Sequence, residues 1–104
     1  MNVIEIEAAL SVCERMIDKL QRELYSNNAM LGAMNSAYEA LTENDKIIYK
    51  AKVQQLGYLI TYRIELLNYA ETTLNGGTPG TEPELEIAKY TLPGGTEQDF
   101  DFSL

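Results

Sequence analysis

The chain has no histidine, no tryptophan and only one cysteine, Cys13, among its 104 residues. Without histidine it lacks the commonest general base, the commonest zinc ligand and the usual partner of a catalytic serine or cysteine. A single cysteine excludes an internal disulfide and any paired-cysteine metal or redox site. We therefore expect a protein that is not an enzyme and that carries no metal and no other cofactor.

Long apolar runs are also missing. No stretch approaches the roughly 18 consecutive apolar residues that a membrane-spanning helix needs. The first residues include Glu5 and Glu7, whereas a secretory signal peptide begins with basic residues. These features predict a soluble, cytoplasmic protein that has no membrane partner.

Positive charge is scarce. The chain has 16 acidic and 8 basic side chains, a net charge of −8. Residues 1–74 have a net charge of −3 (ten acidic, seven basic), and residues 75–104 have −5 (six acidic, one basic). Since a basic face is the usual requirement for holding nucleic acid, we expect no direct nucleic-acid binding.

The N-terminal segment has the pattern of a long amphipathic helix that begins near residue 3. Asn2 and Glu5 have the spacing of a capping box. Apolar residues then recur at alternating steps of three and four, a heptad seam. The seam consists of Val3, Ile6, Leu10, Cys13, Ile17, Leu20 and Leu24. Cys13 is therefore expected to be a small buried apolar residue. The pattern permits a helix as far as residue 41, but residues 26–28 favour a break.

A second helix is predicted from Thr42, an N-cap residue with Asp45 three positions on, to about Leu74. Asn75-Gly76-Gly77 is a strong stop signal. One side of this helix carries an aliphatic stripe, and Gly57 beside it permits close approach of a partner helix. The stripe consists of Tyr49, Val53, Leu56, Ile60, Leu67 and Leu74. A short link before Thr42 makes the flanking helices antiparallel neighbours.

After Gly77 the composition becomes rich in glycine, proline and acidic residues. Residues 82–92 fit a short helix and a strand nearly equally well. We expect two regions, a helical domain over 1–74 and a partly extended acidic tail over 75–104.

The predicted fold class is all-α, a long antiparallel helical hairpin or three-helix unit. Two helices cannot cover both apolar sides of the second one, and burial must offset the entropy of ordering the backbone. We therefore expect the chain to form an oligomeric helical bundle, with a homodimer as the simplest case.

Opposite the aliphatic stripe, Tyr58, Tyr62 and Tyr69 lie on one side of the second helix with Glu65 among them. Tyrosine suits interfaces because its ring buries well while its hydroxyl keeps a polar partner. This side is predicted to pack on the chain itself, to bind a partner protein or another subunit, or to stack a planar ligand.

Two weaker candidate sites remain. Phe100 and Phe102 alternate with acidic residues at the C-terminus, an arrangement similar in composition to the partner-recruiting tails of single-stranded DNA-binding proteins. Basic residues could attract an anion near the start of the second helix. They are Lys46, Lys50 and Lys52, with Arg63 further along.

These features favour a non-enzymatic helical interaction protein, an adaptor or inhibitor that occupies a partner's surface. Phage and mobile-element accessory proteins provide an analogy of size, charge and helicity. One alternative is a protein that binds or sequesters a nucleotide-like ligand in an intersubunit pocket of tyrosine and lysine. A further alternative is an acidic DNA mimic, which suits the overall charge better than its distribution.

Overall fold

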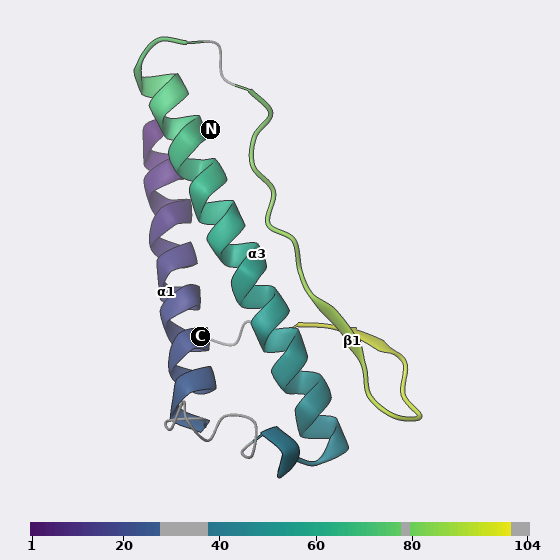
Figure 1. Ribbon diagram of the computed structural model, residues 1–104. Helices are drawn as coiled ribbons and strands as arrows, with labels where there is room; N and C mark the ends of the chain where they lie inside the picture. Colours follow the sequence, from purple (N-terminus) through teal and green to yellow (C-terminus); the bar gives the residue numbers. More distant parts are fainter. Residues whose placement is uncertain (28–37, 78–79, 101–104) are drawn as a thin grey trace.

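The computed structural model of the chain describes residues 1–27, 38–77 and 80–100. Most of it is helical: α1 (Val3–Asn27) packs antiparallel against α3 (Glu43–Leu74), as predicted (Figure 1). A small antiparallel sheet of β1 (Lys89–Thr91) and β2 (Glu97–Asp99) lies beside α3, which departs from a purely α-helical fold. In the described part of the chain, neither helix combines the length and apolarity needed to cross a membrane.

Helix α1 begins with the predicted capping box. The Glu5 N–H donates to Asn2 Oδ1 at 2.8 Å, and the Asn2 N–H donates to Glu5 Oε1 at 3.1 Å. The predicted seam is buried along most of its length, at Ile6, Cys13, Ile17, Leu20 and Leu24. Val3, at its start, is exposed. The helix continues to Asn27, and the rest of the expected break lies outside the described residues.

Helix α3 has both predicted ends. The Asp45 N–H donates to Thr42 Oγ1 at 3.1 Å, which satisfies one of the free donors of the first turn. The helix ends at Leu74, and Gly76 follows with a positive φ of 74°, a conformation that favours glycine. Local capping chemistry therefore sets the bounds of α3.

The tyrosine side of α3, rather than its aliphatic stripe, packs within the chain. The residues buried on α3 are Ala51, Gln55, Leu59, Leu66 and Tyr69. By contrast, four residues of the predicted stripe are exposed: Val53, Ile60, Leu67 and Leu74. Gly57 makes no close approach either, since a Cβ added there would meet nothing within 4 Å. Of the alternatives for this side, packing on the chain itself holds for Tyr69, which is buried, and for Tyr62, which packs against the core, whereas Tyr58 is only half-buried.

The centre of the core joins both helices. Its buried members are Cys13, Ile17, Leu20 and Leu59. The Cys13 thiol donates to the Leu59 carbonyl oxygen at 3.3 Å, and burial raises the pKa of that thiol. Cys13 is thus a buried packing residue, as predicted from its place in the seam.

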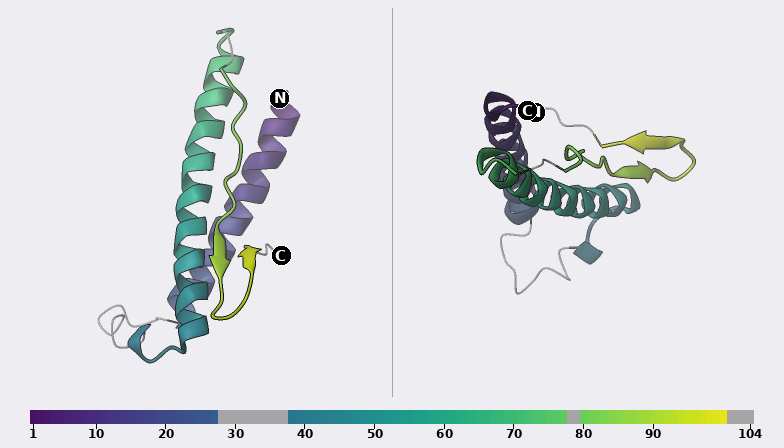
Figure 2. Two further views of the ribbon diagram at one scale, coloured as in Figure 1. Left: turned by 90° about the vertical axis from the view of Figure 1, so that its right-hand side faces the viewer. Right: turned by 90° about the horizontal axis from the view of Figure 1, so that it is seen from above.

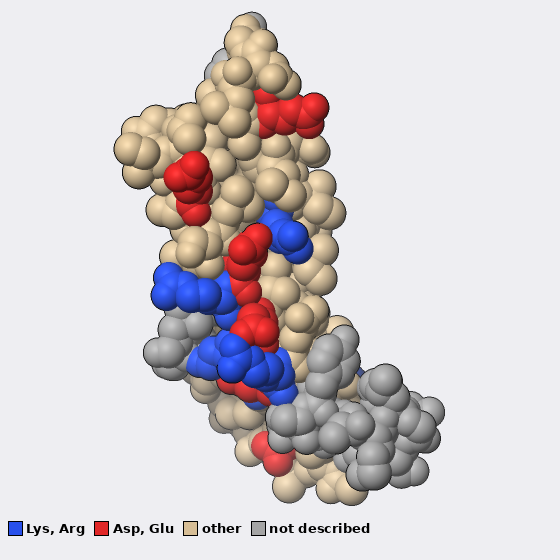
Figure 3. Space-filling view, turned by 90° about the vertical axis from the view of Figure 1, so that its left-hand side faces the viewer, with Lys and Arg blue, Asp and Glu red and all other residues tan. Residues whose placement is uncertain are grey.

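Two ion pairs join the helices at the margin of this core. Lys52 Nζ lies 3.2 Å from a Glu23 carboxylate oxygen, and Arg63 Nε lies 3.7 Å from one of Glu14. Figure 3 shows basic and acidic side chains next to one another on the side that carries α1. Such exposed pairs stabilise a fold only slightly, so the apolar contacts carry most of the packing energy.

The C-terminal segment runs in extended form along α3 before it reaches the sheet. Seen from above, it lies on the same side of α3 as α1 does (Figure 2). Pro93 and Gly94 then form a tight turn, in which Gly94 has a φ of 74° and the Gly95 N–H donates to the Leu92 carbonyl at 2.9 Å. Of the two alternatives for residues 82–92, the structure has the extended one.

Candidate functional site

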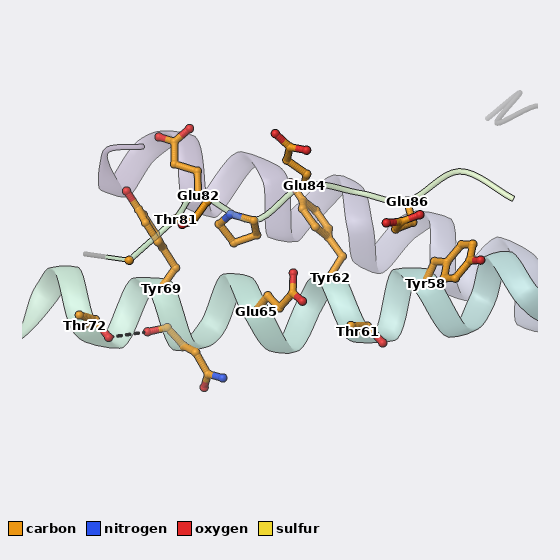
Figure 4. A pocket seen from close by; sticks show the side chains of 13 residues that line it. Tyr58, Thr61, Tyr62, Glu65, Tyr69, Thr72, Thr81, Glu82, Glu84 and Glu86 are labelled. Carbon is orange, nitrogen blue, oxygen red and sulfur yellow. Dashed lines mark hydrogen bonds between the residues drawn. The ribbon is translucent and has the colours of Figure 1, made fainter. Parts of the chain in front are cut away.

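A groove of about 660 Å³ lies between α3 and residues 80–86. Figure 4 shows its two walls, the helix on one side and the extended chain on the other. The helical wall consists of Tyr58, Thr61, Tyr62, Glu65, Asn68, Tyr69 and Thr72. The extended wall consists of Gly80, Thr81, Glu82, Pro83, Glu84 and Glu86.

The helical wall contains the four α3 residues predicted as a binding site. Tyr58, Tyr62 and Tyr69 project from α3 toward the extended segment, with Glu65 between the last two (Figure 4). Tyr69 is buried, whereas Tyr58 and Tyr62 are half-buried and keep part of each ring accessible. Burial raises the pKa of the Tyr62 hydroxyl, which also stands near Cys13. Aromatic surface thus lines one side of the groove.

The extended wall supplies three carboxylates that the site prediction missed. Glu82, Glu84 and Glu86 alternate along an extended chain, and Figure 4 shows the Glu82 and Glu84 carboxylates pointing away from α3. Leu85, between two of them, packs against the core instead. This alternation of acidic and apolar residues was visible in the sequence, but it identifies a wall only once the segment is known to be extended.

Gln55 attaches this wall to α3. Its side chain is fully buried, and its Nε2 donates to the Glu86 carbonyl oxygen at 2.9 Å. In return, the Ala88 N–H donates to Gln55 Oε1 at 2.6 Å. One amide therefore satisfies a donor and an acceptor of the extended backbone, much as a neighbouring strand would. No sequence pattern signals this role, because a lone glutamine beside the tyrosines is expected to face solvent.

A cation already lies at one end of the groove. The terminal ammonium group of Met1 donates to Tyr69 Oη at 3.2 Å and forms an ion pair with Glu82. These interactions raise the pKa of this amine from 8.0 to about 10; the hydrogen bond to Glu82 has the largest effect and that to Tyr69 the next. A tyrosine hydroxyl and a carboxylate thus bind an ammonium group together at this place.

The ammonium contact predicts a pH dependence. Because the folded-state pKa is raised, the contact stabilises the fold fully below pH 8 and is lost as the pH rises through about 10. Glu82→Gln should therefore lower the melting temperature near pH 7, and the difference from wild type should vanish above about pH 11. Comparing the two proteins at each pH cancels the effects that do not involve Glu82. A Met1 amine pKa near 8 in the wild-type protein, measured by NMR titration, would contradict the assignment.

The predicted anion-binding residues do not join the groove. Lys46 pairs with Glu39 at 3.5 Å and Glu43 at 3.7 Å, and it also lies over the Tyr38 ring. Lys50 lies over the same ring at 5.9 Å. Lys52 and Arg63 make the ion pairs with α1 described above. None of these four basic residues is therefore among the described residues that line the groove with Tyr58, Tyr62 and Tyr69.

The two predicted phenylalanines have different outcomes. Phe100 is half-buried against the core, and its N–H donates to the Ala88 carbonyl oxygen at 2.9 Å. It therefore anchors the end of β2 within the chain. Phe102 lies outside the described residues.

The groove is electrostatically one-sided. Four carboxylates line it, and none of its described lining residues is a lysine or an arginine. Carboxylates attract ammonium and guanidinium groups, and tyrosine faces add cation–π attraction. In the ranges that the structure describes, the groove included, no three acidic or cysteine side chains are grouped as metal ligands would be. The site is therefore suited to holding a cationic organic group.

Comparisons with protein-family models, with curated proteins and with solved structures yield no match to this chain.

Proposed function

We propose that this chain is a non-catalytic interaction protein whose groove binds a lysine- or arginine-rich segment of a partner protein. The observation that carries the proposal is the pairing of tyrosine rings from α3 with carboxylates from the extended segment around one open groove. The Met1 ammonium between Tyr69 and Glu82 supports it, because it is an ammonium group that contacts a tyrosine and a carboxylate of this lining.

An extended basic peptide fits this groove better than a nucleotide does. The groove lies along α3 from Tyr58 to Thr72, a length of about 21 Å at 1.5 Å per residue, enough for about six extended residues. Phosphate groups would meet four carboxylates there, and the basic residues that could neutralise them are elsewhere. The nucleotide-like alternative therefore receives less support.

Fluorescence anisotropy with a labelled octa-lysine peptide tests this proposal. The variant Glu82→Gln/Glu84→Gln/Glu86→Gln should weaken binding at least about tenfold, and added salt should weaken binding to the wild-type protein. A matched control removes three carboxylates away from the groove, with Glu7→Gln/Glu97→Gln/Asp99→Asn. The control should keep affinity within about threefold of wild type, since it changes net charge equally but not the groove.

Two results would contradict the proposal. If both triple variants lose the same affinity, the peptide responds to net charge alone. If the wild-type protein does not bind the peptide even at low salt, the groove is not a site for basic segments.

The expected self-association is part of the same proposal and involves a different surface. The groove lies between α3 and the C-terminal segment, whereas the exposed aliphatic residues of α3 are not among those that line it. In such an oligomer another copy of the chain covers the aliphatic side of α3, and the groove stays accessible to a partner protein.

A further inference from the structure

The side of α3 that faces away from α1 and the C-terminal segment is aliphatic. Leu59 and Gln55, which contact α1 and the C-terminal segment, mark the side of this helix that packs within the chain. On the other side, five aliphatic residues are between 42% and 63% exposed and lie within about 80° of one another around the helix axis. They are Val53, Ile60, Ile64, Leu67 and Leu74, here named the outer stripe.

The outer stripe has two further properties. Gly57 lies beside it, although glycine destabilises a helix interior and no described residue fills the space where its Cβ would be. The aliphatic part from Val53 to Leu67 is flanked by opposite charges, with exposed Lys50 before it and exposed Glu71 after it. These two charges lie about 31 Å apart along the helix at 1.5 Å per residue.

We propose that a second copy of this chain covers the outer stripe, with the two α3 helices antiparallel and the two-fold axis near Ile60. This inference rests on the proposed self-association and specifies its surface and register. With the two-fold axis near Ile60, each residue lies level with the residue of the other copy for which the two numbers add up to about 120. Lys50 of each copy therefore lies level with Glu71 of the other. A parallel arrangement would instead place lysine beside lysine and glutamate beside glutamate, which is unfavourable.

The same register also explains the glycine. Gly57 of one copy lies level with Ile64 of the other, so the missing Cβ leaves room for a branched side chain. Val53 likewise lies level with Leu67 of the other copy. The two-fold arrangement closes on itself and buries the same stripe on both copies, as expected of a homodimer.

Disulfide trapping tests the surface and the register, on the full chain with Cys13→Ala to remove the native thiol. In the antiparallel register, the double variant Val53→Cys/Leu67→Cys should form a covalent dimer under mild oxidation. Neither single variant should do so, since each introduced cysteine lies about 21 Å along the axis from its own copy. A disulfide requires the Cα atoms within about 7 Å. Val53 and Leu67 are exposed, so their replacement should leave the fold intact, whereas Cys13 is buried and circular dichroism compares the Cys13→Ala protein with wild type first.

Charge reversal gives an independent readout. Lys50→Glu and Glu71→Lys should each raise the dissociation constant of the homodimer at least about tenfold. An equimolar mixture of the two variants should form the heterodimer preferentially, because both of its cross-pairs then join opposite charges. Native mass spectrometry distinguishes these species.

The possible failures are distinguishable. Light scattering on the wild-type protein should give twice the 11.7 kDa of one chain. A monomer at every concentration would overturn both self-association and this interface, but leave the peptide-binding groove to its own test. A dimer whose single-cysteine variants cross-link would overturn the antiparallel register. A dimer that no cysteine variant traps would overturn the choice of surface.

Discussion

Replacing Leu59 with alanine is expected to lower the free energy of unfolding by about 2–5 kcal/mol. Leu59 has no exposed surface and packs against Cys13, Ile17 and Leu20 of α1, so the shorter side chain leaves a cavity between the helices. Most domains of this size are stable by about 5–15 kcal/mol, and the loss would be a large share of that. Urea denaturation followed by circular dichroism, at one fixed protein concentration, measures it.

Ile4→Ala is the matched control, because it also shortens an aliphatic residue. The Ile4 side chain is 76% exposed, so this change should alter the free energy of unfolding by less than about 0.5 kcal/mol. Equal effects of the two substitutions would contradict the packing of α1 against this side of α3.

Replacing Gln55 with alanine is expected to release the C-terminal segment and to lower stability by about 2–4 kcal/mol. The change leaves the Ala88 N–H and the Glu86 carbonyl without their partner, at about 1–3 kcal/mol for each buried group. Hydrogen exchange should accelerate at Ala88 and at Phe100, whose N–H binds the Ala88 carbonyl oxygen. The exchange of α1 amides should change much less.

Gln54→Ala serves as the control for this prediction. Gln54 precedes Gln55 but is exposed, and its amide donates only to the Tyr58 hydroxyl at 2.7 Å. Its loss should leave exchange at Ala88 unchanged. Retained protection in the Gln55 variant would mean that the apolar contacts of Leu85 and Phe100 hold the segment without the glutamine.

The helices could be predicted because their signals are local. The capping residues Asn2, Glu5 and Thr42 and the stop near Gly76 each act within one or two turns, and the structure has helix ends at these places. The seam of α1 was predicted equally well, since it is apolar on one side only and leaves one way to bury it.

The orientation of α3 could not be predicted, for a physical reason. Aliphatic residues lie on one side and tyrosines on the other, so periodicity alone does not decide which side faces α1. Long-range partners decide it: Gln55 binds the backbone of Glu86 and Ala88, 31 and 33 residues away. For the same reason Tyr58, Tyr62, Tyr69 and Glu65 were predicted as a site, whereas the carboxylates of the opposite wall were not.

The attachment through Gln55 has a thermodynamic consequence for any ligand of the groove. One wall is a helix and the other a segment that can detach, so only molecules with the segment docked have a complete groove. The apparent dissociation constant is then the intrinsic dissociation constant divided by the docked fraction. By linkage, a bound ligand in turn shifts the equilibrium toward the docked segment. Mutations at Gln55, which touches no ligand, would thus weaken binding without altering the chemistry of the groove, and a tightly bound peptide would in turn protect the Ala88 amide from exchange.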